Sequence, residues 1–378
     1  MSKQANVDIE AGHDALDRGW LIRLHIDLPL LLLLLLVSAF GLLMLYSATG
    51  QSVVQVERQA IRLGLALVLM LGIAQLSPAV LRQWSVPLYL IGLALLAAVL
   101  LFGDQSKGAQ RWLDLGFLRF QPSEMLKLAL PMMLAWYLSL RTLPPRLLDI
   151  VVAGLLIGLP VLLIFKQPDL GTALLVGSAG VATLFLSGLR WRFILSLVVL
   201  AGVAAPLLWS LMHDYQRQRV LTFLDPGSDP LGAGYHIIQS QIAIGSGGIH
   251  GKGWLQGTQS QLEFLPERST DFIFAVIGEE LGLSGIIVLM LLYLAVILRG
   301  FGIAAQAQDA YSRLLAGSIT MVFFVYLFVN MGMVTGLLPV VGVPLPLISY
   351  GGTSLVTLML GFGILMSIQT RRKLLQAE

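Results

Sequence analysis

Ten long apolar segments constrain the fold of this chain more than any other feature of its sequence. They cover approximately residues 28–47, 59–77, 86–103, 124–140, 149–165, 171–187, 193–212, 272–297, 314–335 and 354–369. A helix that crosses a bilayer needs about 20 mostly apolar residues. Within lipid, every backbone polar group needs an internal partner, which leaves helices for such segments. With a mean hydropathy of +0.83, we expect an all-α polytopic membrane protein with ten transmembrane helices.

The distribution of basic residues predicts the orientation of this bundle. An even number of spans puts both termini on one side of the membrane. Basic residues on that side number 13, against 5 on the short opposite loops. The first set is Lys3, Arg18, Arg23, Arg82, Arg141, Arg146, Arg190, Arg192, Arg299, Arg313, Arg371, Arg372 and Lys373, and the second is Arg58, Lys107, Arg111, Arg119 and Lys166. Positive charge favours the cytoplasm, so we expect cytoplasmic tails at 1–27 and 371–378 around a membrane domain at 28–370.

Three segments on the opposite side are expected to carry the chemistry. They are 104–123, 213–271 between the seventh and eighth spans, and 336–353. Loops as long as the first two are usually functional. The third is rich in proline and glycine, which excludes a regular helix, and we expect it to dip back into the protein. Its breakers are Pro339, Pro344, Pro346, Gly351 and Gly352.

Composition excludes several classes of function. The net charge of +3 is spread over the loops and gives no reason to expect a nucleic-acid partner. The chain has no cysteine, which removes disulfides, thiolate metal sites and cysteine nucleophiles. It also has no His, Asp or Glu cluster with metal-ligand spacing, no Gly-x-Ser-x-Gly elbow and no Asp-x-Asp motif of the kind that binds nucleotide-sugars through a metal.

Asp271 is the leading candidate for a catalytic residue. It lies where the polar segment 264–271 meets the apolar segment that starts at Phe272, at the expected membrane boundary. A carboxylate there could act as a general base toward a substrate with its tail in lipid and its head in water. The alternative is an N-cap, because Thr270 or Asp271 would begin the eighth span. The neighbouring Glu267 and Arg268 would face the same water pocket.

Glu124 and Lys127 form a second candidate site at the start of the fourth span. They lie three residues apart and therefore share one face of the helix. Ionisable residues inside a membrane span usually have a function. The alternative is a structural ion pair that locks the packing of two helices. The sequence leaves both interpretations open.

Two basic segments in the outer region could bind phosphate groups. The glycine-rich run 245–253 does not match a nucleotide phosphate loop, but its N–H groups and Lys252 could cradle a pyrophosphate. The alternative is a flexible surface turn. His213, Arg217 and Arg219 could bind lipid headgroups or a substrate's pyrophosphate.

The remaining acidic residues of interest have simpler interpretations. Glu279 and Glu280 are neighbours about two turns beyond Asp271, so at most one can share its helix face. At least one of them is therefore expected to be structural. Asp169 is placed to cap the sixth span.

Several blocks of sequence resemble those of the SEDS (shape, elongation, division and sporulation) family, in the same order over nearly the whole chain. They are Gly-Ala-Gln-Arg-Trp-Leu-Asp-Leu-Gly (108–116), Gln-Pro-Ser-Glu (121–124), Gln-Pro-Asp-Leu-Gly-Thr (167–172), Gly-Lys-Gly (251–253), Leu-Pro-Glu-Arg-Ser-Thr-Asp-Phe-Ile-Phe (265–274), Gly-Glu-Glu-Leu-Gly (278–282) and Pro-Leu-Ile-Ser-Tyr-Gly-Gly (346–352). The short N-terminal tail and the stretch 339–347 are more similar to the cell-elongation branch than to the division branch.

The resemblance implies a ten-helix protein of the bacterial inner membrane that polymerises lipid II into peptidoglycan strands, with its active site facing the periplasm. It implies that Asp271 is the functional acid of the large outer loop and that Glu124 and Lys127 are the intramembrane pair. The implied partners are lipid II, the nascent glycan strand, membrane lipid and a class B penicillin-binding protein. A divalent cation, Mg²⁺ or Mn²⁺, could assist.

The expected site follows from these observations. Asp271 is the general base, and undecaprenyl pyrophosphate is the leaving group. Ten residues are expected to bind substrate: Arg111, Glu124, Lys127, Arg217, Arg219, Lys252, Glu267, Arg268, Gly351 and Gly352. No metal ligand is assigned. Two other functions stay open, namely a lipid II flippase and a non-catalytic scaffold for the penicillin-binding protein.

Overall fold

A computed structural model describes most of the chain. The described residues are 24–106, 109–114, 119–167, 169–189, 193, 195–196, 199, 202–203, 206, 209–210, 212, 214–225, 227, 232–262, 264–265 and 267–371. Much of the expected seventh span, 193–212, and the expected site residue His213 lie outside them.

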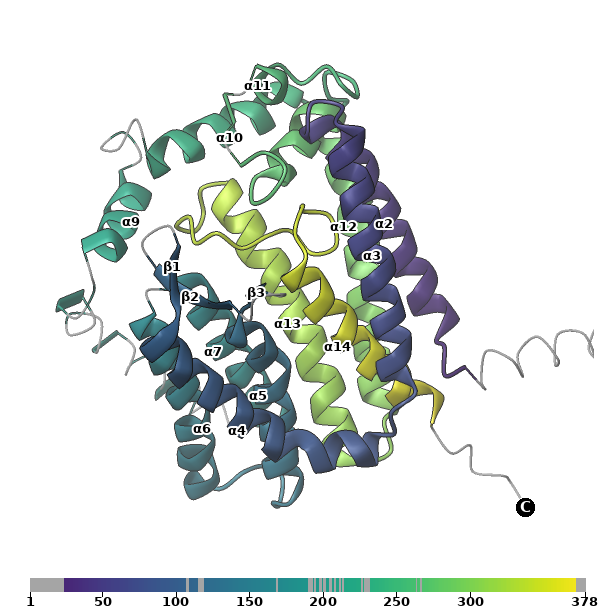
Figure 1. Cartoon of the computed structure of the whole chain (residues 1–378), viewed down its shortest axis with the longest axis vertical. Coiled ribbons are helices and arrows are strands. Elements are labelled where there is room, and N and C mark those ends of the chain that lie inside the picture. Colours follow the sequence, from purple (N-terminus) through teal and green to yellow (C-terminus); the bar gives the residue numbers. More distant parts are fainter. Residues whose placement is uncertain are drawn as a thin grey trace, which may run out of the picture.

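The protein is an all-α polytopic membrane protein, as expected, built from long helices packed side by side (Figure 1). The bundle helices are α2 (Leu28–Ala48), α3 (Val53–Ala74), α4 (Pro78–Phe102), α5 (Pro122–Ser139), α6 (Leu147–Lys166), α7 (Leu170–Leu186), α12 (Ile273–Gln306), α13 (Ala310–Val334) and α14 (Thr353–Thr370). Among the described residues, six helices are long and apolar enough to cross a membrane, namely α2, α4, α6, α12, α13 and α14.

Polar caps set where several of these helices begin. The side chain of Asp27 accepts a hydrogen bond from the Leu30 N–H at 2.9 Å at the start of α2. Asp309 accepts one from the Ser312 N–H at 3.0 Å at the start of α13. Such caps satisfy N–H groups that have no partner inside the helix, so the polar residues between apolar segments fix the helix boundaries.

Helix α13 forms the centre of the bundle. Of its apolar window, 72% is buried, against 28% for the peripheral α4 and α6. Helix α13 packs against α12, α7 and α5, and α14 packs along α3 (Figure 1). Loops that leave the ends of α13 are therefore positioned by a largely enclosed helix.

The outer segments contain more regular structure than expected. Residues 104–123 include the antiparallel strands β1 (Asp104–Ser106), β2 (Ala109–Asp114) and β3 (Arg119–Phe120), in the order β1-β2-β3. Residues 213–271 include α9 (Asp214–Leu224), α10 (Ala233–Gly247) and α11 (Thr258–Gln261), which lie across one end of the bundle (Figure 1). Helix α10 packs on α12 and α13, and these contacts allow a helix in a segment too polar to span a membrane.

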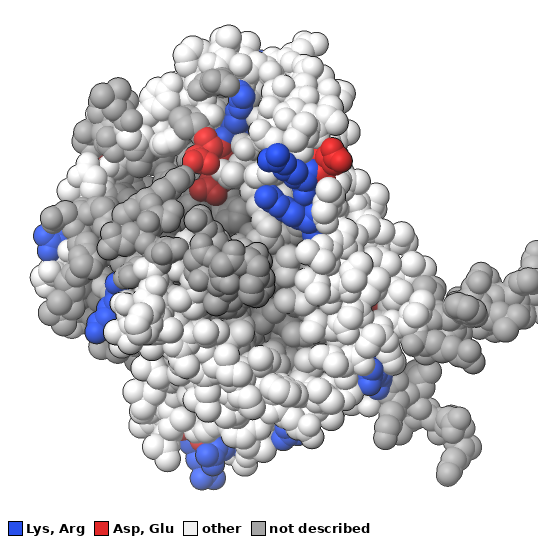
Figure 2. All heavy atoms as spheres, in the orientation of Figure 1, with Lys and Arg blue, Asp and Glu red and all other residues white. Residues whose placement is uncertain are grey.

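Charged side chains gather toward the two ends of the helix bundle on the face shown in Figure 2. On the face shown in Figure 2, acidic and basic residues gather near the end that carries α10 and α11, and a few basic residues lie along the opposite edge. Uncharged residues cover much of the surface between them. This distribution fits an apolar belt in the bilayer with polar surfaces at both ends.

Candidate functional site

Asp271 lies in a turn that leads into α12 and does not cap that helix. The N-cap residue is Phe272, and no side chain makes a cap hydrogen bond there. The Glu267 carbonyl accepts hydrogen bonds from the N–H groups of Thr270 at 3.0 Å and Phe272 at 3.3 Å, so this turn delays the start of the helix. The N-cap interpretation of Asp271 is therefore wrong.

The turn that carries Asp271 is tied to the segment between α13 and α14. The Nδ2 group of Asn330, in α13, donates to the Asp271 carbonyl at 2.8 Å and to the Val343 carbonyl at 2.7 Å. The Tyr350 N–H donates to the Ser269 carbonyl at 2.8 Å. Because these bonds fix the backbone on both sides, the half-buried Asp271 carboxylate has a defined position.

The segment that faces Asp271 brings a glycine against its carboxylate. Gly342 has φ of 73°, and a Cβ on it would lie 3.5 Å from Asp271 Oδ2. Gly342 also lines a small polar pocket. Asp271 is therefore adjacent to the wall of that pocket.

Glu124 and Lys127 form a buried ion pair inside the bundle. Their side chains approach to 2.6 Å between Lys127 Nζ and Glu124 Oε1. Lys127 also donates a short hydrogen bond to the hydroxyl of Tyr326 in α13. The other carboxylate oxygen, Glu124 Oε2, is buried and has no hydrogen-bond partner among the residues that the structure describes. An acceptor in this state is available to a ligand.

The small polar pocket has a volume of about 180 Å³. Its polar lining includes Glu124, Lys127 and Asp169. Asp169 caps α7 through the Thr172 N–H at 3.2 Å and also accepts from the Thr172 hydroxyl at 2.9 Å, which confirms its expected capping role. The pocket thus combines fixed charges with a volume suited to a few polar groups.

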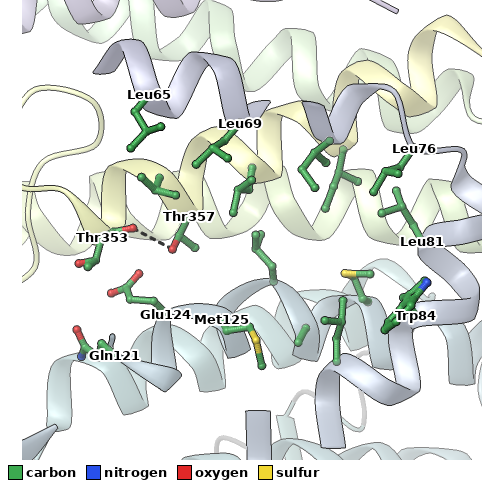
Figure 3. Close-up of a pocket in the computed structure, with 18 of the residues that line it drawn as sticks. Leu65, Leu69, Leu76, Leu81, Trp84, Gln121, Glu124, Met125, Thr353 and Thr357 are labelled. Carbon is green, nitrogen blue, oxygen red and sulfur yellow. Dashed lines mark hydrogen bonds between the residues drawn. The ribbon is translucent and has the colours of Figure 1, made fainter. Parts of the chain in front are cut away.

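An apolar groove of about 860 Å³ opens beside this pocket (Figure 3). Its walls come from α3, α4, α5 and α14, and its polar residues gather at one end, where Glu124, Gln121 and Thr353 lie. Trp84 and Leu76 lie at the other end. Gln121, Glu124 and Thr353 line both the groove and the polar pocket. The two cavities together fit an amphiphile with a long apolar chain and a polar head.

The glycine-rich run packs against α12 instead of forming a free loop. Helix α12 bends at Gly282, where φ is 63°. The N–H groups of Lys252 and Gly253 donate to the carbonyls of Glu279 at 3.0 Å and Glu280 at 2.9 Å. The proposed pyrophosphate cradle is wrong for these N–H groups, because the protein already uses them.

Lys252 is held by a buried carboxylate. Its Nζ lies 2.8 Å from Glu279 Oε1, and Glu279 is fully buried. Glu279 also accepts from the backbone N–H groups of Gln259 at 2.8 Å and Ser260 at 3.2 Å. The neighbouring Glu280 is fully buried as well and accepts from Ser47 at 2.5 Å. Glu279 thus fastens the outer segment to the bundle, and Glu280 joins α12 to α2.

The other predicted site residues whose side chains the structure describes lie in three regions. Glu267 and Arg268 belong to the turn before α12, and Arg268 donates to the Ser260 carbonyl. Gly351 and Gly352 precede α14 at the polar end of the groove. Arg217 donates to the carbonyls of Trp209 at 3.0 Å and Ser210 at 2.9 Å. The side chains of Arg111 and Arg219 lie outside the described part of the structure.

Sequence reasoning missed one residue of this region, Arg62 in α3. It lines the groove beside Gly352. The available signal was an arginine within an apolar segment, since ionisable residues inside membrane spans are rare.

Comparisons with known proteins match nearly the whole chain. A family model of cell cycle proteins of the FtsW, RodA and SpoVE type matches residues 27–374. The peptidoglycan glycosyltransferase MrdB of Escherichia coli is 57% identical over 93% of this chain and 96% of its own length. A probable peptidoglycan glycosyltransferase, FtsW of Geobacter metallireducens, is 40% identical over 92% of this chain and 95% of its own length.

Solved structures share the fold. A chain from a peptidoglycan synthase complex, studied for its coordination of polymerization and crosslinking, aligns with a TM-score of 0.80 and 37% identity. It covers 92% of this chain and 98% of its own. The rod shape determining protein RodA of Thermus thermophilus aligns with a TM-score of 0.70 and 32% identity over the same shares.

Proposed function

Because the chain belongs to the SEDS family of FtsW-, RodA- and SpoVE-type cell cycle proteins, we propose that it is a peptidoglycan glycosyltransferase that polymerises lipid II during cell elongation. The observation that carries the proposal is the contact between the two cavities. An apolar groove and a polar pocket share the residues Gln121, Glu124 and Thr353, and Asp271 adjoins the pocket through Gly342. This arrangement suits a lipid-linked sugar.

In the proposed reaction, the 4-hydroxyl of an acceptor sugar attacks the anomeric carbon of a donor sugar. Asp271 takes the hydroxyl proton as the new carbon–oxygen bond forms. The bond between the anomeric carbon and the pyrophosphate oxygen breaks, and undecaprenyl pyrophosphate leaves. The pyrophosphate already activates the donor, so no nucleotide is required. A general base in this position contributes about 10²–10⁴ to the rate.

In this proposal, Glu124 binds the substrate and Lys127 holds Glu124 in place. Glu124 Oε2 is a buried acceptor without a partner and lies where both cavities meet. We assign it to a hydroxyl or amide of the bound sugar. Lys127 holds the other oxygen and offsets the charge of the carboxylate in the apolar interior.

The basic residues expected to bind pyrophosphate contribute unequally. Lys252 is neutralised by Glu279, and Arg217 already donates to two carbonyls. The proposal therefore keeps Arg111 and Arg219 as the candidates from that set, with Glu267, Arg268, Gly351 and Gly352 shaping the surroundings. The divalent cation, Mg²⁺ or Mn²⁺, stays a prediction and is assigned no step here; the described residues contain no group of three or more His, Cys, Asp or Glu side chains that could hold one.

We further propose the orientation and the partners. Positive charge on the side of the termini supports a cytoplasmic location for both. Asp271 and the outer helices then face the periplasm across the bacterial inner membrane. A class B penicillin-binding protein, which crosslinks the peptides of the new strands, is the proposed partner, and the structural neighbour from a synthase complex supports it.

The proposal is tested by incubating the purified protein with lipid II, alone and with the penicillin-binding protein, and separating the products by length. Glycan chains are expected. If lipid II stays unpolymerised in both cases but crosses the membrane of reconstituted vesicles, the protein is a flippase. If it does neither, and still recruits the penicillin-binding protein, it is a scaffold.

A further inference from the structure

Arg62 is a cation at the polar end of the apolar groove. Its guanidinium lies over the ring of Tyr350, at 4.6 Å from the ring centroid. No hydrogen bond or ion pair joins it to any residue that the structure describes. An arginine has five N–H donors in a fixed plane that matches phosphate oxygens. These donors are available to an anionic ligand.

The N-terminus of α14 lies directly against Arg62. Gly352 is the N-cap residue of this 18-residue helix, and no side chain caps the first turn. A Cβ on Gly352 would lie 3.6 Å from Arg62 Cδ. The first N–H groups of a helix carry partial positive charge and favour anions. Arg62 and α14 thus present two adjacent anion-binding elements.

A second observation points to a ligand at the same place. Glu124 lines the same end of the groove, and its Oε2 atom is buried without a hydrogen-bond partner in the described part of the chain. Figure 3 shows the Glu124 carboxylate pointing toward the groove from α5, opposite Thr353 at the start of α14. Since Lys127 offsets the charge of Glu124, Arg62 contributes the positive charge among the residues that line the groove.

The groove is long enough for an extended apolar chain. Its α3 wall runs from Arg62 to Ile73. At 1.5 Å of rise per residue, this wall is about 17 Å long. That is roughly half of the 30 Å thickness of a bilayer's hydrocarbon core. An occupant therefore combines a long hydrocarbon chain with an anionic group at the end marked by Arg62.

We propose that Arg62 and the first turn of α14 bind the diphosphate of a polyprenyl-linked substrate, with the polyprenyl chain along the groove. The Glu124 carboxylate then accepts a hydrogen bond from the sugar that is attached to the diphosphate. This inference rests on the proposed function, and it assigns the diphosphate to a residue outside the set predicted from sequence. Two phosphate groups match the two adjacent anion-binding elements.

The test measures binding, so that it does not depend on turnover. Undecaprenyl pyrophosphate and uncharged undecaprenol are titrated into the detergent-solubilised protein in an Asp271→Ala background. We expect Arg62→Gln to weaken undecaprenyl pyrophosphate binding about tenfold or more, as loss of charge-assisted hydrogen bonds does, and to leave undecaprenol binding unchanged. Arg62→Lys, which keeps the charge but not the planar fork, should fall between wild type and Arg62→Gln.

Arg58→Gln is the matched control. Arg58 is exposed one turn earlier on α3 and does not line the groove, so its loss should leave both affinities unchanged. If Arg58→Gln and Arg62→Gln weakened undecaprenyl pyrophosphate binding equally, the effect would come from general surface charge, and the proposal would be overturned. An Arg62→Gln variant that binds undecaprenyl pyrophosphate as wild type does would also overturn it.

Phosphatidylglycerol separates the proposed ligand from bulk lipid. It should compete weakly with undecaprenyl pyrophosphate, because it offers one phosphate. Competition of equal strength would make the groove a phospholipid site and overturn the proposal. Failure of the proposed polymerase function would look different. Wild type would then form no glycan chains, while its binding of undecaprenyl pyrophosphate would still depend on Arg62.

Discussion

At the scale of single residues, the site combines one carboxylate at its edge with an ion pair in its interior. Asp271 is half-buried, with its backbone held by Asn330. Glu124 and Lys127 are 7% and 3% exposed. A buried pair can lock packing or serve a substrate, and the unpartnered Glu124 Oε2 favours the second role.

Substitutions of this pair separate the two roles. Lys127→Met leaves the Glu124 charge buried and unpaired, which should cost about 3–5 kcal/mol of stability. The double variant Glu124→Gln with Lys127→Met removes both charges and should regain most of the lost melting temperature. We expect the double variant to stay inactive in lipid II polymerisation. Recovery of activity together with stability would make the pair purely structural.

Residue identity alone predicted much of this site and also misjudged some of it. Asp271, Glu124 and Lys127 stood out because ionisable residues are rare near apolar segments. The cap role of Asp271 was wrong because a turn centred on the Glu267 carbonyl displaces the start of α12. No local pattern reports such a turn. Lys252 and Glu279 lie 27 residues apart, and their pairing depends on tertiary packing.

At the scale of elements, α13 positions the turn that carries Asp271. Asn330→Leu removes both hydrogen bonds to the carbonyls of Asp271 and Val343. Each bond contributes about 0.5–1.5 kcal/mol, and their loss frees Asp271 to move. We expect kcat for polymerisation to fall by more than tenfold while KM for lipid II changes little. A displacement of about 1 Å at a reacting group costs about 10² in rate.

Ser318→Ala is the matched control for Asn330→Leu. Ser318 is a fully buried polar residue of the same helix, but its hydroxyl bonds only the Leu314 carbonyl within α13. Its loss should leave kcat unchanged. An Asn330→Leu protein with the wild-type kcat would refute the positioning role.

The bend of α12 locks the outer segment to the membrane bundle. A Cβ on Gly282 would lie 2.3 Å from the backbone nitrogen of Gly251, and the backbone there has a positive φ of 63°. Gly282→Ala should therefore destabilise the protein by at least the 1–3 kcal/mol of such backbone strain. Hydrogen exchange should increase over 248–262, where the segment loses its contact with α12.

Gly302→Ala in the same helix supplies the comparison. Nothing lies within 4 Å of a Cβ at that position, and alanine favours a helix over glycine by about 1 kcal/mol. Its melting temperature should equal or exceed that of wild type. Equal melting temperatures for Gly282→Ala and Gly302→Ala would contradict the close packing at the bend.

Several ends of the bundle helices were predicted wrongly, because sequence of mixed polarity extends these helices beyond their apolar segments: α3 begins at Val53 and not at 59, α4 begins at Pro78 and not at 86, and α12 ends at Gln306 and not at 297. Most bundle helices themselves could be predicted, because long apolar segments mark them. Helices α9, α10 and α11 could not, because their segment is polar and α10 is held by α12 and α13. The strands β1 and β2 pair with Gln105 opposite Gln110. Such short pairings leave little periodic signal in a sequence.

At the scale of the whole molecule, the orientation in the membrane can be tested with single cysteines. The native chain has none, so no background needs removal. His250→Cys should react with a membrane-impermeant maleimide in spheroplasts whose inner membrane is intact, because the outer segment faces the periplasm in our proposal. Gln308→Cys, in the exposed turn between α12 and α13, should react only after permeabilisation. The reverse pattern would invert the topology.

The most direct test of the account is polymerisation of saturating lipid II by Asp271 variants, with the folded state checked by melting temperature. Asp271→Asn keeps the shape of the side chain but removes the base, and we predict that kcat falls by about 10²–10⁴. Asp271→Glu, which keeps the carboxylate, should retain measurable chain formation. Wild-type kcat in Asp271→Asn would contradict the assignment of Asp271 as the base.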